Sequence, residues 1–223
     1  MQNIVRKICQ CRTNSLSLRT EVDIVMLYAI AHFLRDRMPW LWDLVDVINS
    51  WLFSLRFGSR LEDVESKVME KYASETGYEV CRMREVEASQ LADFFAVQPE
   101  EAYKYFKPHK FDVASIKKLQ RNKSFLAYLV LDEGRIAGYC FNRSFFHGRG
   151  FRGTIVDFNC QGRGIGTLMK KILNDVGFGI GLRLFETVAK DNLASYRSSL
   201  SASKVRVMKE MPHNELFLEI IQR

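Results

Sequence analysis

Apolar and polar positions follow a helical rhythm in the first third of the chain. Between residues 41 and 55 the apolar side chains return every three or four positions, as on one face of a helix. These side chains are Leu41, Leu44, Val45, Ile48, Trp51, Leu52 and Leu55. Ser59 then has the character of a cap for a second helix, which stops at Gly77. We therefore expect an irregular basic tail over residues 1–19 and a helical extension over residues 20–76.

Beyond this extension, short apolar stretches alternate with amphipathic ones, which predicts a domain of the α/β (α+β) class over residues 77–223. Strands are expected at residues 79–83, 125–131, 136–143, 151–158, 182–189, 205–208 and 216–221. Helices are expected at residues 87–95, 113–120 and 167–176, and from residue 193. The turn Asp132-Glu133-Gly134-Arg135 joins two of the strands as a hairpin.

The most informative local pattern is a glycine-rich turn between the strand at 151–158 and the following helix. Gly162, Gly164 and Gly166 alternate with larger residues there. Side-chain-free positions let backbone N–H groups converge, and a helix N-terminus adds unpaired amides and a partial positive charge. The turn therefore predicts a site for a phosphate or pyrophosphate group.

Two common phosphate sites do not fit this turn. A nucleotide-binding P-loop has lysine directly after its last glycine, whereas Thr167 follows Gly166 here. A dinucleotide fingerprint has different glycine spacing and is followed by several βαβ units, for which too little chain remains.

Two motifs together suggest a family. Gln161-Gly162-Arg163-Gly164-Ile165-Gly166 resembles the [RQ]-x-x-G-x-[GA] segment of GNAT superfamily acetyltransferases, and Asn192-Leu193-Ala194-Ser195 resembles their later N-x-x-[AS] motif. Phe158 replaces a proline of the family pattern. The resemblance implies a mixed, mostly antiparallel twisted sheet flanked by helices. It also implies acetyl-CoA as cofactor and direct transfer of the acetyl group to an amine in a ternary complex.

The resemblance further implies which residues meet acetyl-CoA: the glycine turn its pyrophosphate, and the asparagine and nearby backbone amides its pantetheine arm. The expected cofactor-binding residues are Ile155, Val156, Phe158, Gln161, Gly162, Arg163, Gly164, Ile165, Gly166, Thr167, Asn192 and Ser195.

Catalytic groups are harder to assign. Many GNAT enzymes have a tyrosine seven residues after the asparagine, where this chain has Ser199. Tyr196 is the candidate acid, and His147 and Asp157 are candidate bases, with Glu186 a weaker one. Each also has a structural interpretation, as helix packing, a surface histidine or a paired carboxylate, and solvent is an alternative proton acceptor.

The acceptor is expected to lie against the loop at residues 98–111. Its predicted contacts are Tyr103, Tyr105, Phe106 and His109, although these aromatics also suit a loop closed onto the core. Tyr105-Phe106-Lys107-Pro108-His109 and Phe145-Phe146-His147-Gly148 look like segments of GNAT enzymes from surface-polysaccharide pathways. An amino sugar or sugar nucleotide is therefore the favoured acceptor.

The net charge and the cysteines narrow the kinds of ligand, metal site and cellular setting that suit this chain. The net charge is +7, and six basic residues gather between residues 141 and 173: Arg143, Arg149, Arg152, Arg163, Lys170 and Lys171. A polyanionic cofactor explains this clustering, a solvated basic face is the alternative, and no nucleic-acid motif accompanies it. Five cysteines without a zinc-like pairing predict no metal site and a reducing, cytoplasmic setting.

The amino-terminal third leaves several alternatives open. No signal peptide is expected, and its longest apolar run, Ile24 to Leu34, is too short to span a bilayer. The extension suits packing on its own domain, a homodimer or docking of a partner. The whole chain is then a small-molecule acetyltransferase, a protein-directed acetyltransferase or a non-catalytic acyl-CoA-binding module.

Overall fold

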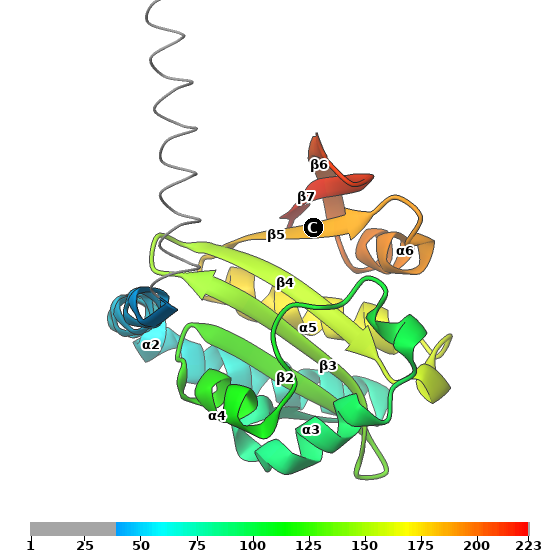
Figure 1. The fold of residues 1–223 in the computed structure, drawn as a ribbon, viewed down its shortest axis with the longest axis horizontal. Helices are drawn as coiled ribbons and strands as arrows, with labels where there is room; N and C mark the ends of the chain where they lie inside the picture. Colours follow the sequence, from blue (N-terminus) through cyan, green and yellow to red (C-terminus); the bar gives the residue numbers. More distant parts are fainter. Residues whose placement is uncertain (1–38, 223) are drawn as a thin grey trace, which may run out of the picture. The chain divides into compact units, whose positions relative to one another are not determined.

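The computed structural model describes residues 39–222, in which seven strands form one mixed sheet (Figure 1). The strand order is β1-β2-β3-β4-β5-β7-β6, and every neighbouring pair is antiparallel except β4 and β5. The strands are β1 Glu79–Arg82, β2 Phe125–Asp132, β3 Arg135–Phe145, β4 Arg149–Val156, β5 Arg183–Ala189, β6 Lys204–Met211 and β7 Glu215–Ile221. The described helices are α2 Pro39–Thr76, α3 Ala88–Ala96, α4 Val113–Arg121, α5 Ile165–Gly179 and α6 Leu193–Ala202. The expected mixed, mostly antiparallel sheet flanked by helices is confirmed.

Helices cover both faces of the sheet, which explains the uninterrupted apolar run of β2. Leu126, Tyr128 and Val130 join one buried cluster with residues of α2 and α5. Ala127, Leu129 and Leu131 alternate with them and join a second cluster with α3 and α4 (Figure 1). Because successive side chains of a strand point to opposite faces, a strand covered on both sides has no polar alternation.

The chain divides into two compact units, residues 1–47 and 48–223, and the second contains the sheet. Helix α2 runs through the expected cap at Ser59 without a break, so the prediction of two helices was wrong. A glycine such as Gly58 weakens a helix by about 1 kcal/mol. Burial of Phe57 and Leu61 on either side outweighs that cost. The predicted stop is confirmed, since Gly77 adopts a φ of +74°.

The predicted tail over residues 1–19, the first part of the extension and the apolar run Ile24 to Leu34 lie outside the described residues, and the domain boundaries stay predictions. Within residues 39–222, no helix has both the length and the apolar composition needed to cross a membrane.

The parallel pair at the centre of the sheet is short. Strands β4 and β5 are paired only over Arg149–Phe151 and Arg183–Phe185. Beyond Phe151, β4 continues alongside β3 and β5 continues alongside β7. The sheet therefore separates into two halves from Arg152 and Glu186 onward, as Figure 1 shows between β4 and β5.

Candidate functional site

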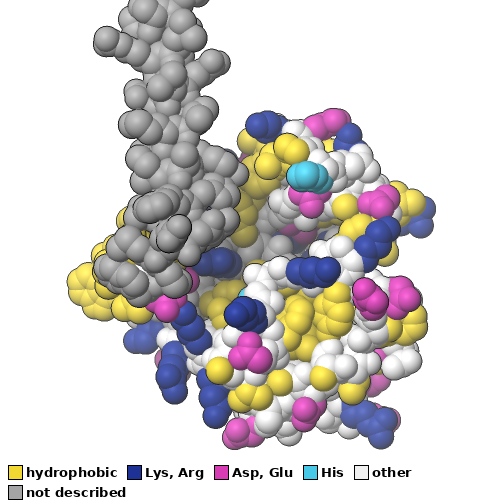
Figure 2. All heavy atoms as spheres, in the orientation of Figure 1, with side chains coloured by type: hydrophobic (Ala, Val, Ile, Leu, Met, Phe, Trp, Pro, Cys, Tyr) yellow, Lys and Arg dark blue, Asp and Glu magenta, His cyan; other side chains and the backbone are white. Residues whose placement is uncertain are grey.

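A cleft of ≈ 940 Å³ lies where β4 and β5 separate. Its volume falls in the range of small-molecule and cofactor sites. Residues 152–156 of β4 and 186–189 of β5 line it, together with the glycine turn, residues of α6 between Ala194 and Ser201, and residues 101–107 except Tyr103. Figure 2 shows a hollow between the surface formed by β5–β7 and α6 and the surface formed by β4 and the 101–107 segment, with Lys and Arg side chains beside it.

The backbone of β4 directs polar groups into this cleft. Asp157 donates its N–H to the Ala137 carbonyl oxygen at 2.9 Å. Because bonded and non-bonded pairs alternate along an antiparallel ladder, Val156 and its partner Gly138 form a non-bonded pair. The N–H and carbonyl of Val156 therefore point away from β3, toward the side that β5 has left.

The glycine turn is built as an anion site. Gly162 and Gly164 have φ of +76° and +82°, and a Cβ added to either would meet nothing within 4 Å. Gly164 is the N-cap of α5, and Thr167 and Leu168 both donate to its carbonyl at 3.0 Å. Within the described residues, the amides before Thr167 in this turn find no protein acceptor. Open space, unpaired amides and the helix N-terminus together suit a phosphate or pyrophosphate.

The predicted cofactor residues converge on this cleft, with two exceptions. All of them except Phe158 and Arg163 line it. The Phe158 N–H donates to Gln98 Oε1 at 2.9 Å, so this amide is already bonded within the protein. Arg163 pairs with Asp132 at 2.8 Å. Both lie on the motif, but their polar groups are engaged elsewhere.

The structure does not bring the predicted catalytic residues together. Asp157 accepts from Gln98 Nε2 and from the Asn159 N–H, both at 2.8 Å, and so caps a short turn. His147 is exposed and stacks on Phe145 at the β3–β4 hairpin, the opposite end of β4 from the cleft. Tyr196 is half-buried on α6 and does not line the cleft. Their catalytic roles therefore stay predictions without geometric support.

The predicted acceptor residues separate into two pairs. Tyr105 and Phe106 line the cleft. Tyr103 instead donates its hydroxyl to the Phe95 carbonyl, and its ring packs on Phe111. His109 approaches the Tyr139 hydroxyl at 3.1 Å within an aromatic cluster, where burial lowers the pKa of its imidazole. Half of this loop thus faces the cleft, and half closes onto the core.

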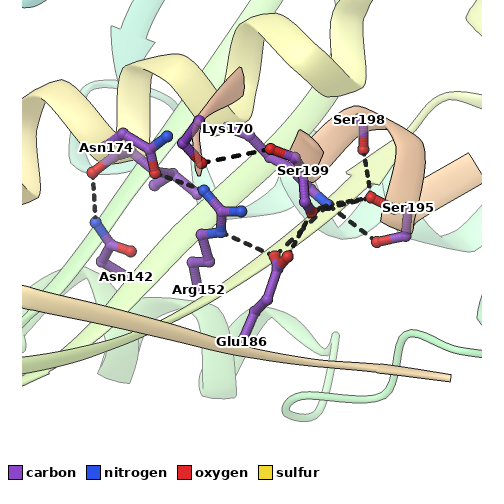
Figure 3. A network of polar contacts seen from close by, with 10 residues as sticks. Asn142, Arg152, Lys170, Asn174, Glu186, Ser195, Ser198 and Ser199 are labelled. Carbon is purple, nitrogen blue, oxygen red and sulfur yellow. Dashed lines mark hydrogen bonds and ion pairs between the residues drawn. The ribbon is translucent and has the colours of Figure 1, made fainter. Parts of the chain in front are cut away.

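A buried charged cluster that no sequence motif indicates lies at the floor of the cleft (Figure 3). Arg152 Nε contacts Glu186 Oε2 at 2.8 Å, where the two strands begin to part. Lys170 Nζ lies 3.5 Å from the same carboxylate oxygen, and Ser199 donates to the other. Burial alone would raise the pKa of Glu186, but Arg152 and Lys170 hold it below its usual value. Arg152 and Lys170, two of the six basic residues between residues 141 and 173, are therefore interior groups rather than contacts for a polyanion.

A second, smaller pocket of ≈ 370 Å³ lies beside α2. Three of its charged groups, Arg82, Arg84 and Glu85, are held in ion pairs. Arg82 and Arg84 bind Glu65 at 2.7 and 3.0 Å, and Arg82 also binds Glu85 at 2.7 Å. Because it lacks a glycine cradle and has less than half the volume of the cleft, this pocket is the weaker candidate.

Comparisons with known proteins identify the family and the fold. Residues 83–198 match the model of the acetyltransferase (GNAT) family. The GNAT domain of S. lividans PAT superposes with a TM-score of 0.56 at 14% identity, covering 64% of this chain and 89% of that one.

Other solved structures share the fold at similarly low identity. The Salmonella typhimurium protein yncA, solved with its cofactor acetyl-CoA, gives a TM-score of 0.51 at 16% identity, with 65% and 93% of the two chains covered. The aminoglycoside acetyltransferase AAC(6')-Ib with coenzyme A and kanamycin gives 0.50 at 13%, with 66% and 95% covered. Among curated proteins, no sequence matches the chain. The chain belongs to the acetyltransferase (GNAT) family.

Proposed function

We propose that this protein transfers the acetyl group of acetyl-CoA to the primary amine of a small molecule, with an amino sugar or sugar nucleotide as the favoured acceptor. The observation that carries the proposal is the opening of the sheet. An unpaired edge of β4, a glycine cradle and the first turn of α6 all face one cleft.

The described residues fit acetyl-CoA in three places. The turn at residues 162–166 has the open space and unpaired amides that a pyrophosphate requires. Val156 presents its backbone polar groups to an amide-bearing arm, and Asn192 and Ser195 flank the same path. Lys107 and Arg197 line the cleft and add positive charge for a polyanionic ligand.

The acceptor side of the cleft combines aromatic and acidic groups. Tyr105 offers an exposed ring face against which a sugar ring stacks, while the Phe106 ring lines the cleft as a buried side chain. Glu101 and Glu215 also line the cleft, and their carboxylates attract an ammonium group. This combination supports an amino sugar as the acceptor. An amino-sugar acceptor would in turn suit a GNAT enzyme of a surface-polysaccharide pathway that acts in the cytoplasm.

Acetyl-CoA supplies an acetyl group already activated as a thioester. The chain has to orient the amine, accept a proton from it, stabilise negative charge on the carbonyl oxygen and protonate the departing sulfur. Backbone N–H groups along the free edge of β4 suit the third task. We assign direct attack without a covalent enzyme intermediate.

The test is thiol release from acetyl-CoA in the presence of glucosamine 1-phosphate, a nucleotide-linked amino sugar, kanamycin and a lysine-containing peptide. Faster thiol release with glucosamine 1-phosphate or the nucleotide-linked amino sugar than with the peptide supports the proposal. The mass of the acceptor should rise by one acetyl group. Release with the peptide alone contradicts the acceptor class. Binding of acetyl-CoA without release on any amine favours the non-catalytic module.

One observation favours the protein-directed alternative. Ile48, Trp51 and Leu55 lie along α2 with 48%, 62% and 65% of their surface exposed. An exposed apolar stripe of this kind is typical of a protein-docking surface. In that case Trp51→Ser should abolish acetylation of a protein substrate and leave turnover of a small amine unchanged.

A further inference from the structure

The cluster at the floor of the cleft contains more positive charge than a simple ion pair needs (Figure 3). Arg152 and Glu186 already form a buried pair at 2.8 Å. Lys170 adds a second cation, whose side chain is only 2% exposed. Since removing an ammonium from water is unfavourable, a lysine in this position calls for a role beyond neutralising Glu186.

The contacts of Lys170 lead toward the cleft. Its Nζ donates to the Ser195 carbonyl at 2.7 Å, to Ser195 Oγ at 3.0 Å and to Ser199 Oγ at 2.5 Å. Ser195 lines the cleft, whereas Lys170 and Ser199 lie behind it. A single hydroxyl therefore separates the buried ammonium from the cleft. Figure 3 shows the contacts of Lys170 with Ser195.

We propose that Lys170 supplies, through the hydroxyl of Ser195, the proton that the coenzyme A sulfur takes up when the acetyl group leaves. The inference rests on the acetyl transfer proposed above. The Ser195 O–H bond breaks as its proton passes to the thiolate, and Ser195 Oγ takes a proton from Lys170. The electron pair of the broken N–H bond stays on the lysine nitrogen. Solvent then restores the ammonium with the equivalent of the proton that the amine releases.

The electrostatics of the cluster suit this role. Burial, the largest influence, lowers the pKa of Lys170 to about 8, Glu186 opposes that change, and Arg152 lowers the pKa further. The charged groups that face Lys170 are thus Glu186 from β5 and Arg152 from β4, while α6 contributes the neutral Ser195 and Ser199. A proton donor is most effective when its pKa lies near the working pH. We therefore expect turnover to fall as the pH rises through about 8.

The first experiment compares pH profiles of thiol release, with the best amine of the panel above, for the wild type, Ser195→Ala and Ser195→Thr. Ser195→Ala removes the connecting hydroxyl but keeps the contacts of Lys170 with the Ser195 carbonyl, Ser199 and Glu186. In Ser195→Ala we expect kcat to fall about 100-fold, as is common when a proton donor is lost, with the KM of the amine little changed. Ser195→Thr should restore kcat. Lys170→Arg should lower kcat and abolish the decline of turnover near pH 8. The variant of its exposed neighbour, Lys171→Arg, should keep the wild-type pH profile.

A second readout needs no turnover. The protein labelled with ¹³C at the lysine side chains, without acetyl-CoA, should show one lysine titrating near pH 8, and this signal should vanish in Lys170→Arg. Titration of Lys170 near its ordinary value of 10.5 would overturn the inference. So would an unchanged kcat and pH profile in Ser195→Ala. If the wild type releases no thiol on any amine, the proposed function itself fails, and the inference fails with it.

Discussion

The two ends of β4 differ in how they are held, and the difference locates the function. At Arg149–Phe151 the strand has neighbours on both sides, and the Phe151 and Phe185 rings stack with centroids 5.6 Å apart. From Gly153 to Val156 it keeps β3 but no longer pairs with β5. The charged cluster of Arg152 and Glu186 marks the point of change. Backbone groups become available for a ligand only where the sheet stops using them.

The largest effect on this arrangement is expected from Glu186→Gln. The substitution keeps the shape of the side chain but leaves two buried cations, Arg152 and Lys170, without a counter-charge. Loss of one partner from a buried ion pair costs about 3–5 kcal/mol, which urea unfolding measures. Glu210→Gln, in an exposed pair with Lys190, is the control and should cost no more than about 1 kcal/mol. Equal losses in the two variants would show that the cluster does not support the strand junction.

The pH dependence of stability tests the same cluster. Because the pKa of Lys170 is lowered to about 8 from 10.5, the unfolded chain binds this proton more tightly than the folded protein. Stability should therefore rise between pH 8 and 10.5, by no more than about 3 kcal/mol, and be unaffected by this group below pH 8. Unfolding in urea at pH 7.5 and pH 10 should show the gain in the wild type relative to Lys170→Met. A constant difference between the two proteins would place the lysine pKa at its ordinary value.

Two glycines of α5 allow the paired end and the unpaired end of β4 to be tested separately. Gly177 packs on Leu184 of β5, and Gly166 lies beside Val156 of β4. A Cβ on Gly177 would lie 2.7 Å from Leu184 Cδ2, so Gly177→Ala should cost about 1–3 kcal/mol through overpacking. A Cβ on Gly166 would meet Val156 at an ordinary 3.5 Å, so Gly166→Ala should leave stability unchanged or raise it. Acetyl-CoA affinity should change in the opposite sense, falling for Gly166→Ala and persisting for Gly177→Ala. Unfolding and binding measurements on both variants check this, and parallel losses would contradict it.

The smallest effect concerns the edge of the cleft. The Tyr105 hydroxyl donates to Asp191 at 2.8 Å, joining the acceptor loop to the turn before α6. Tyr105→Phe keeps the ring and should leave the KM of the amine nearly unchanged. Tyr105→Ala should raise that KM about 2- to 10-fold if the ring stacks on the acceptor. Equal KM values for the two variants would remove Tyr105 from the acceptor site.

The glycine turn and its flanking strand and helix were predictable because their signals are local. Gly162, Gly164 and Gly166 stand between two periodic segments, and the conformation depends mainly on neighbours in sequence. The continuity of α2 was not predictable in this way. Its passage through Gly58 and Ser59 depends on side chains that pack against a sheet formed much later in the chain.

The roles of the site residues also depend on contacts between residues that are far apart in the sequence. Asp157 is a reasonable candidate base from the sequence alone, because Gln98, which binds its carboxylate, lies far away in the chain. The sequence places Lys170 in a basic cluster suited to a polyanionic cofactor and makes Glu186 a weak candidate base, although both interrupt otherwise apolar stretches. Opposite charges on the buried faces of a helix and a strand are a usable signal for an interior pair. Such a signal identifies the partners only when the two elements are known to be adjacent.

Calorimetric titration of acetyl-CoA into the wild type, Gly164→Glu and Gly181→Glu tests directly whether the glycine turn holds the cofactor. Gly164 and Gly181 lie at opposite ends of α5 with φ of +82° and +89°, and a Cβ on either meets nothing within 4 Å, so both variants suffer similar backbone strain. We expect saturable binding to the wild type and to Gly181→Glu, and none to Gly164→Glu, whose carboxylate would fill the cradle and repel the phosphates. Equal binding to all three proteins, or none to the wild type, would contradict this expectation.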